Sequence, residues 1–208
     1  MNTDALLGQL PLLLAWTAYG AIHSILAADA CKNAVAKHWP ALHRRYRMCY
    51  NVLATLLLLP LAMLMHANPG PGIWVWSGLA GWVANAIAAA AVLALVAVPT
   101  GYDTRAFAGL APEPPSFVIG PWHRVVRHPW YFVGLVVVWT RDMDLATLVS
   151  ATAITLYFVI GSRLEEAKLA RLLGDPYREY LRRVPGLVPR PWRILDAPTA
   201  RRLAGRND

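Results

Sequence analysis

The chain has 208 residues, of which 57% are hydrophobic and 15% are charged, and its formal net charge is +8. Soluble domains are usually about one quarter charged. Here the apolar residues fall in long blocks, which excludes a soluble globular protein and predicts an integral membrane protein. In a soluble protein the positive charge would suggest a nucleic-acid partner, but in a membrane protein topology explains it, so no nucleic-acid partner is expected.

Five apolar blocks follow one another along the chain, at about 5–28, 46–66, 78–98, 129–140 and 143–162. A helix needs roughly 20 residues to cross a bilayer, and four of the blocks are long enough. The fourth block would be on the order of 18 Å long, so it either begins earlier, near residue 125, or is tilted and partly buried by protein. We therefore expect an all-α fold: a polytopic membrane helix bundle of about five transmembrane helices with a C-terminal cytoplasmic helical tail.

The Lys and Arg residues alternate between rich and poor segments. There are five in residues 29–47, none in 67–77, three in 99–128, one in 141–142 and eleven from 163 onward. Cytoplasmic loops carry the excess of positive charge. The pattern predicts an N-terminus outside and a C-terminus in the cytoplasm. We expect the membrane to be a bacterial inner membrane, with its lipids as partners.

Polar residues that border the predicted spans gather at the cytoplasmic ends. They include His23, Tyr50, the stretch 120–131 and the pair Glu165 and Glu166. Charged and imidazole groups at this depth are costly unless they pair, reach water or bind a ligand. The clustering predicts one site, open to a water-soluble ligand from the cytoplasm and to an apolar ligand from the bilayer.

A helix is expected to continue past the last block. On it Glu165, Leu169 and Leu172 share a face, which directs Glu165 toward protein or ligand. Glu166 is three residues from Arg163 and is expected to pair with it at the surface.

A second tail helix, to about residue 183, has apolar residues at helical spacing. They are Tyr177, Tyr180, Leu181 and Val184, and arginines occupy the other side. This pattern predicts a helix that lies on an anionic membrane surface. We expect a single domain over residues 1–195 and a flexible tail over residues 196–208.

Familiar catalytic motifs are missing from the sequence. No Gly-rich phosphate loop precedes a helix, and neither HExxH nor CxxC occurs, so neither a nucleotide fold nor a metal site is expected. Cys31 and Cys49 have no ligand or redox spacing and are expected to be reduced thiols. What remains is a set of aromatic, basic and acidic side chains that would suit a ligand with a soft cation and hydroxyl groups: Trp122, Arg127, His128, Trp130, Tyr131 and Glu165.

Two groups of residues resemble a known family. Residues 127–131 (RHPWY), with Glu165-Glu166 and the pattern through Pro189, resemble the C-terminal signature of membrane methyltransferases related to isoprenylcysteine carboxyl methyltransferase. Residues 20–24 (GAIHS) and 102–109 (YDTRAFAG) resemble the NnrU-like branch, which includes methanethiol S-methyltransferase.

The resemblance implies an S-adenosyl-L-methionine-dependent methyltransferase with its cofactor at the cytoplasmic side. The cofactor-binding residues that it implies are Trp122, His128, Pro129, Trp130, Tyr131 and Glu165. Gly161 stands where the isoprenylcysteine enzymes have an arginine for the substrate carboxylate. This departure argues against a prenylated-peptide acceptor, and the expected acceptor is a small or lipophilic molecule, a thiol above all.

A thiol acceptor reacts as its thiolate, and a nearby cation raises the thiolate fraction. We expect Arg127, His23 and Tyr50 to serve the acceptor as catalytic residues. The alternative is a haem-binding NnrU-like membrane protein or isomerase, in which His23 and His128 share a metal. The sequence carries six histidines, so this alternative stays open at this point.

Overall fold

The structure is a computed structural model that describes residues 3–97, 105, 108–111 and 117–205. Residues 102–104 and 106–107 of the predicted NnrU-like motif lie outside the described residues. Helices dominate the described chain, as expected, and the strands β1 (Gly72–Trp74) and β2 (Met143–Asp144) form one short antiparallel pair.

The chain divides into two compact units where one domain over residues 1–195 was expected. Unit 1 comprises Met1–Trp74, Asp103–Pro114 and Asp142–Ala153, and unit 2 comprises Val75–Tyr102, Pro115–Arg141 and Ile154–Asp208. The longest helix, α10 (Leu145–Leu173), begins in unit 1 and continues into unit 2.

The helices of unit 1 are α1 (Thr3–Leu7), α2 (Leu10–Ala27), α3 (Asp29–His38), α4 (Pro40–His43), α5 (Tyr46–Leu56) and α6 (Leu58–Ala67). Two of its helix breaks have the same cause. Pro11 and Pro60 each lack an N–H and clash with the carbonyl four residues earlier, so α1 ends at Leu7 and α5 ends at Leu56.

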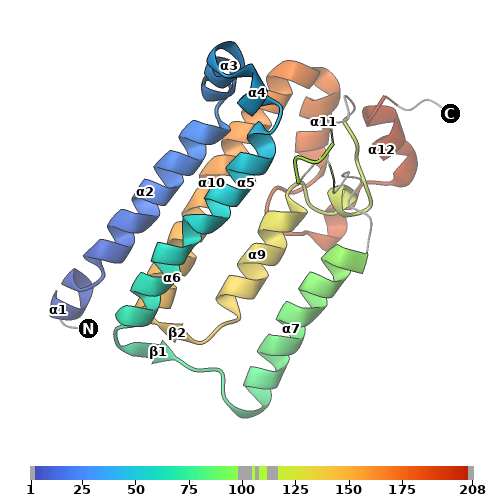
Figure 1. The fold of residues 1–208 in the computed structure, drawn as a ribbon. Coiled ribbons are helices and arrows are strands. Elements are labelled where there is room, and N and C mark those ends of the chain that lie inside the picture. The colour runs from blue at the N-terminus through green and yellow to red at the C-terminus, as the bar shows by residue number, and fades with distance from the viewer. Residues whose placement is uncertain (1–2, 98–104, 106–107, 112–116, 206–208) are drawn as a thin grey trace. The chain divides into compact units, whose positions relative to one another are not determined.

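The core of unit 1 lies where α2, α6 and the first turns of α10 meet (Figure 1). Leu12, Leu61 and Ala146 are almost fully buried there. Trp16 donates from its indole nitrogen to Ser150 Oγ at 2.9 Å, so a side-chain hydrogen bond also joins α2 to α10.

Unit 2 contains α7 (Gly78–Ala97), η1 (Trp122–Arg124), α9 (Pro129–Trp139), the rest of α10, α11 (Asp175–Arg183), η2 (Pro191–Arg193) and α12 (Ala197–Leu203). Figure 1 shows α7 and α9 side by side, and the two helices are in direct contact. Arg141 Nη1 donates to Asn85 Oδ1 at 2.8 Å, which joins the segment after α9 to α7.

Among the described residues, four helical segments are long and apolar enough to cross a membrane: Thr3–Ala27, Tyr46–Ala67, Gly78–Ala97 and Leu145–Leu173. They correspond to the four long blocks of the sequence and establish an integral membrane protein. The short fourth block forms α9, which begins at Pro129 and spans about 16 Å. Its N-terminal end is therefore at the proline, and no earlier start near residue 125 is seen.

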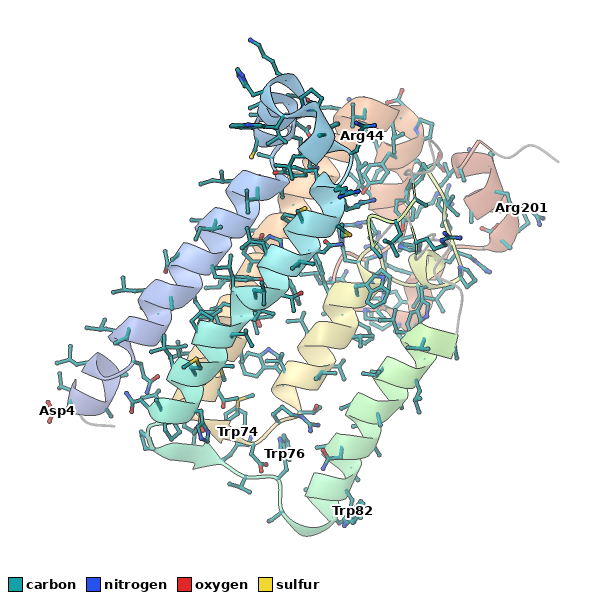
Figure 2. All side chains as sticks on the ribbon, viewed as in Figure 1. Asp4, Arg44, Trp74, Trp76, Trp82 and Arg201 are labelled. Atoms are coloured by element: carbon teal, nitrogen blue, oxygen red, sulfur yellow. The ribbon has the colours of Figure 1, made fainter. Side chains whose placement is uncertain are left out.

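Within each unit, the basic residues and the tryptophans that Figure 2 labels lie at opposite ends of the helices. In unit 1, Asp4 and Trp74 lie at one end of the helices and Arg44 at the other (Figure 2). In unit 2, Trp82 lies at the far end of α7 and Arg201 at the end that carries α11 and α12. In each unit the labelled arginine and the labelled tryptophans therefore lie at opposite ends of the helices.

The C-terminal helices form a core of their own. Tyr177 and Tyr180 of α11 and Leu203 of α12 are each no more than 4% exposed and pack together with Val184 and Leu195. The apolar face of α11 therefore packs against protein, where the sequence suggested a membrane surface. The expected flexible tail likewise differs, because residues 197–203 form a helix that completes this core.

Replacing Leu203 with alanine is expected to lower the free energy of unfolding by about 2–5 kcal/mol, the range for removing a buried leucine side chain. Ile194→Ala is the control, because Ile194 is 54% exposed. Chemical denaturation in detergent micelles measures both variants. Equal stabilities for the two variants would contradict a packed α12.

Candidate functional site

The backbone before α9 is held by a loop from much later in the chain. The N–H of Arg127 donates to the carbonyl of Pro185 at 2.9 Å, and the N–H of His128 donates to the carbonyl of Gly186 at 3.1 Å. These bonds satisfy two donors that no helix satisfies. They fix the position of the His-Pro-aromatic motif relative to the end of α11.

Glu166 lies at the centre of the site. Its Oε1 accepts from Arg127 Nε at 2.8 Å and lies 2.8 Å from Arg127 Nη2. His128 Nε2 is 3.0 Å from the same oxygen. The three side chains are only 9–13% exposed, and an ionised carboxylate only accepts hydrogen bonds. His128 Nε2 therefore donates to Glu166, and the buried charges of Arg127 and Glu166 compensate each other.

Arg127 also caps the C-terminus of α11. Its Nη1 donates to the carbonyl oxygen of Leu181 at 2.9 Å and to that of Val184. The last carbonyls of a helix lack partners within the helix, and a cation there also suits the helix dipole. One guanidinium therefore ties the carboxylate on α10 to the end of α11.

The two glutamates exchange the environments that the sequence predicts for them. Glu166 was expected to pair with Arg163 at the surface, and it is instead the buried partner of Arg127 and His128. The side chain of Glu165 is 49% exposed, with Oε2 3.7 Å from His128 Nδ1. The predicted face was one residue, about 100° of helix rotation, away from the observed one.

An aromatic stack continues from His128 into α10. The rings of His128 and Tyr131 are 5.3 Å apart and nearly parallel, and those of Tyr131 and Phe158 are 4.3 Å apart and parallel within 3°. Gly134 gives Phe158 its space, because a Cβ at that position would lie 3.0 Å from the phenyl ring.

Sequence reasoning missed the contributions of Phe158 and Glu166. A signal for both exists, because Phe158, Ser162 and Glu166 are spaced i, i+4, i+8 and so share one helix face. Ser162, a small residue between them, is only 3% exposed. An aromatic, a small and an acidic residue in line on one helix face would have indicated that this face is the buried side of α10.

The other predicted cofactor residues have distinct environments in unit 2. Trp122 donates from its indole nitrogen to the carbonyl of Ala94 on α7 at 3.1 Å. Pro129 is almost fully buried as the first residue of α9, and Trp130 is 46% exposed. Trp130 and Glu165 are therefore the predicted binding residues that remain most accessible to a ligand.

His23 and Tyr50, two of the three expected acceptor residues, meet within unit 1. Tyr50 Oη lies 2.7 Å from His23 Nε2, and the ring centroids are 5.0 Å apart. The pair joins α2 to α5. The third, Arg127, belongs to unit 2 and is engaged by Glu166 and the end of α11.

No group of three or more His, Cys, Asp or Glu side chains that could hold a metal is present among the described residues. Cys31 and Cys49 are free thiols. The haem alternative is retained as an outcome of the functional test below.

Gly186 allows the loop to approach the buried ion pair. A Cβ there would lie 3.1 Å from Arg127 Nη2 and 3.6 Å from Glu166 Oε1. We expect Gly186→Ala to lower the free energy of unfolding by about 1–3 kcal/mol, as overpacking does. Gly161→Ala is the control in the same unit, since its Cβ would meet only Tyr131 Oη, at 3.9 Å. Thermal unfolding in matched detergent compares them, and a Gly186→Ala protein as stable as wild type would contradict the close approach.

The fold and the site define a polytopic helical membrane protein with a buried Arg–Glu–His cluster beside accessible aromatic and acidic groups. Comparison with known proteins narrows this class. Methanethiol S-methyltransferase 2 of Bradyrhizobium diazoefficiens is 31% identical over 189 residues, which cover 86% of this chain and 72% of the relative. Methanethiol S-methyltransferase of Pseudomonas sp. strain GM41(2012) is 42% identical over 81 residues, and methanethiol S-methyltransferase 1 of B. diazoefficiens is 37% identical over 91 residues. The chain spans 31% of the length of each of these two.

The chain belongs to the methanethiol S-methyltransferase family, and it is an enzyme of the methyltransferase class. No protein-family model and no solved structure matches it. The wider relationship to the NnrU-like and isoprenylcysteine enzymes stays a prediction.

Proposed function

We propose that the protein transfers a methyl group from S-adenosylmethionine to a small thiol, with methanethiol as the first candidate. The observation that carries this proposal is the similarity to methanethiol S-methyltransferase 2 over 86% of the chain. The reaction would form a carbon–sulfur bond in the acceptor and break the methyl–sulfonium bond, with the thiol proton released to solvent. Its products would be dimethyl sulfide and S-adenosylhomocysteine.

The residues of unit 2 fit the methyl donor. When bound, S-adenosylmethionine supplies a methyl group that is already activated on a sulfonium. The exposed ring of Trp130 suits a soft cation, and the half-exposed carboxylate of Glu165 can accept from ribose hydroxyls or an ammonium group. His128 lies close to both, two residues before Trp130 and 3.7 Å from Glu165.

The buried cluster would then act as a frame. Arg127, Glu166 and Tyr131 hold His128 by an ion pair, a hydrogen bond and ring stacking. Positioning is the main protein contribution to a displacement of an activated group, and orientation can contribute several kcal/mol. Because the guanidinium of Arg127 is engaged by Glu166 and α11, we assign this residue to positioning in place of direct contact with the acceptor.

His23 and Tyr50 are proposed to serve the acceptor thiol. A hydroxyl–imidazole pair can receive and pass on a proton, which would raise the fraction of thiolate. We expect His23→Phe and Tyr50→Phe to lower kcat about 100-fold at neutral pH, the lower end of general-base effects, with binding of S-adenosylhomocysteine unchanged. The deficit should shrink as the pH rises toward about 8.5, where free thiols ionise without help.

The measurement follows dimethyl sulfide by gas chromatography, with labelled S-adenosylmethionine and a panel of methanethiol, larger thiols, prenylcysteine analogues and lipid amines. Thr17→Val on the same helix as His23 is the control, because its hydroxyl donates to the carbonyl of Leu13. A deficit that is constant with pH would remove His23 and Tyr50 from proton transfer. A Soret band in the purified protein, without binding of S-adenosylhomocysteine, would favour the haem alternative and overturn the proposal.

We further propose a bacterial inner membrane with the N-terminus outside and the C-terminus in the cytoplasm. The Lys and Arg pattern supports this orientation, as does the placement of Arg44 and Arg201 at one end of their respective units (Figure 2). Relatives from Bradyrhizobium and Pseudomonas support a bacterial setting. Alkaline phosphatase fused after residue 205 should be inactive, and an active fusion would reverse the orientation.

A further inference from the structure

The loop between α11 and α12 presents apolar side chains to solvent. Val188 is 63% exposed, Trp192 is 79% exposed and Ile194 is 54% exposed. Two of the loop's prolines, Pro189 and Pro191, lie among these exposed residues and have no N–H that would need a partner away from water. An exposed tryptophan with few unsatisfied donors suits the boundary between lipid headgroups and acyl chains.

Positive charge surrounds this loop. Residues 175–205 hold seven arginines and three acidic residues. Each acidic group is already engaged: Asp175 pairs with Arg178 at 2.9 Å, Glu179 lies 2.8 Å from Arg183 and 3.0 Å from Arg202, and Asp196 accepts from the N–H of Thr199 at 2.8 Å. The hydrogen bond from Arg202 lowers the pKa of Glu179, so this carboxylate stays ionised and paired at neutral pH.

Two exposed arginines, Arg182 and Arg190, have no acidic partner among the described residues. Arg182 lies next to the loop, since its carbonyl accepts a hydrogen bond from the side chain of Arg193. Arg190 is in the loop itself, two residues before Trp192. A guanidinium presents a planar pair of donors that matches the oxygens of a phosphate group.

The loop is tied to the end of a membrane-spanning helix. Trp122 bonds to Ala94, three residues before α7 ends. Two residues after Trp122, the carbonyl of Arg124 accepts from the N–H of Leu195 at 2.9 Å, and Arg124 Nε donates to the carbonyl of Leu195 at 2.7 Å. Leu195 is three residues from Trp192, which is at most about 11 Å of extended chain. Trp192 is therefore tied through Leu195 and Arg124 to the segment that contacts the end of α7, one of the helices long enough to span a membrane.

We propose that Arg182, Val188, Arg190, Trp192 and Ile194 form an anionic-lipid surface, which binds the phosphate-bearing headgroups of the bilayer that holds the protein. Charge complementarity selects this partner, because the uncompensated arginines flank the exposed apolar side chains. The surface would hold α11 and α12 against the membrane through the loop, while the apolar face of α11 packs against protein.

The test places a probe on the loop of the full-length protein. In a Cys31→Ser, Cys49→Ser background, Trp192→Cys is labelled with an environment-sensitive fluorophore, and the protein is reconstituted into nanodiscs. One set holds phosphatidylcholine alone, and the other holds equal parts of phosphatidylcholine and phosphatidylglycerol. Quenching by neutral acrylamide should fall severalfold in the anionic nanodiscs, and high salt should reverse the change because it screens the arginines.

Arg182→Gln with Arg190→Gln should abolish the lipid-dependent protection, since each arginine contributes about a fivefold change in binding near an anionic surface. Arg44→Gln with Arg45→Gln removes the same charge from unit 1 and should leave the protection intact. A second readout, free of the label, is the difference in quenching by brominated phosphatidylglycerol between wild type and Trp192→Phe.

Three results would overturn the proposal. Equal accessibility in both lipid compositions would show that the loop does not bind anionic lipid. Protection that inorganic phosphate alone produces in phosphatidylcholine nanodiscs would identify a site for free phosphate. Protection that depends on the number of protein copies per nanodisc would show that a second copy covers the loop.

Discussion

Glu166→Gln is expected to be the most damaging single-atom change in the protein. Glutamine keeps the shape of the side chain but removes the charge, which leaves the guanidinium of Arg127 buried without its counterion. Loss of one partner of a buried ion pair typically costs about 3–5 kcal/mol, and the side chains of Glu166 and Arg127 are 11% and 13% exposed. Binding of S-adenosylhomocysteine should also weaken, because His128 exchanges an ionised carboxylate for the weaker, neutral amide oxygen as its acceptor. Chemical denaturation and calorimetry measure the two effects.

Glu165→Gln is the matched control for this prediction. It changes the same chemical group one residue earlier, but its side chain is 49% exposed, so stability should stay within about 0.5 kcal/mol of wild type, as for other surface substitutions. Arg127→Lys tests the same ion pair by changing its basic partner. Lysine keeps the charge but cannot make the same two-pronged set of hydrogen bonds. A destabilised Glu165→Gln beside a stable Glu166→Gln would reverse the assignment of the buried glutamate.

The spans could be predicted because they depend on composition alone. Long apolar blocks become helices in a membrane, where every backbone group must bond internally, and four blocks match four long helices. The helix breaks near Pro11 and Pro60 could also have been predicted from the prolines, although the apolar blocks were drawn as continuous through them. The short fourth block was correctly identified as unusual, and its start at Pro129 follows from the helix preference for proline in the first turn.

The orientation of the tail residues could not be predicted in the same way. The choice between Glu165 and Glu166 depends on which side of α10 meets Arg127, and Arg127 is 39 positions away from Glu166 in the sequence. Likewise the apolar face of α11 has the pattern of a lipid-binding helix, and only the presence of α12 and Phe117 shows that it is covered by protein. Local periodicity identifies an apolar face without identifying what packs on it.

The residues of the His-Pro-aromatic motif were found through resemblance, and the structure divides them by accessibility. His128 and Pro129 are buried and Tyr131 is stacked between two rings. We expect these residues to shape the proposed cofactor site. Trp130 and Glu165 stay accessible and are therefore the ones that can touch a ligand without rearrangement.

Trp130→Ala and Glu165→Ala are accordingly expected to weaken binding of S-adenosylhomocysteine and S-adenosylmethionine in different ways. Glu165 would accept hydrogen bonds from either ligand, and loss of a hydrogen bond to a charged group costs about 1.5–3 kcal/mol, or about 10- to 150-fold in affinity. Trp130 would contact the sulfonium, which only S-adenosylmethionine carries. Its loss should weaken S-adenosylmethionine by about 2- to 30-fold and S-adenosylhomocysteine by less.

The comparison of the two ligands separates a cation contact from simple packing. Isothermal calorimetry on protein in nanodiscs gives both affinities for each variant. Trp192→Ala and Asp175→Asn are the matched controls, because they remove an exposed tryptophan and an exposed carboxylate of the same unit, 79% and 92% exposed respectively, that are not among the proposed cofactor residues. If Trp130→Ala weakens both ligands equally, the ring provides packing alone. If Glu165→Ala binds both ligands as tightly as Asp175→Asn does, Glu165 does not bind the cofactor.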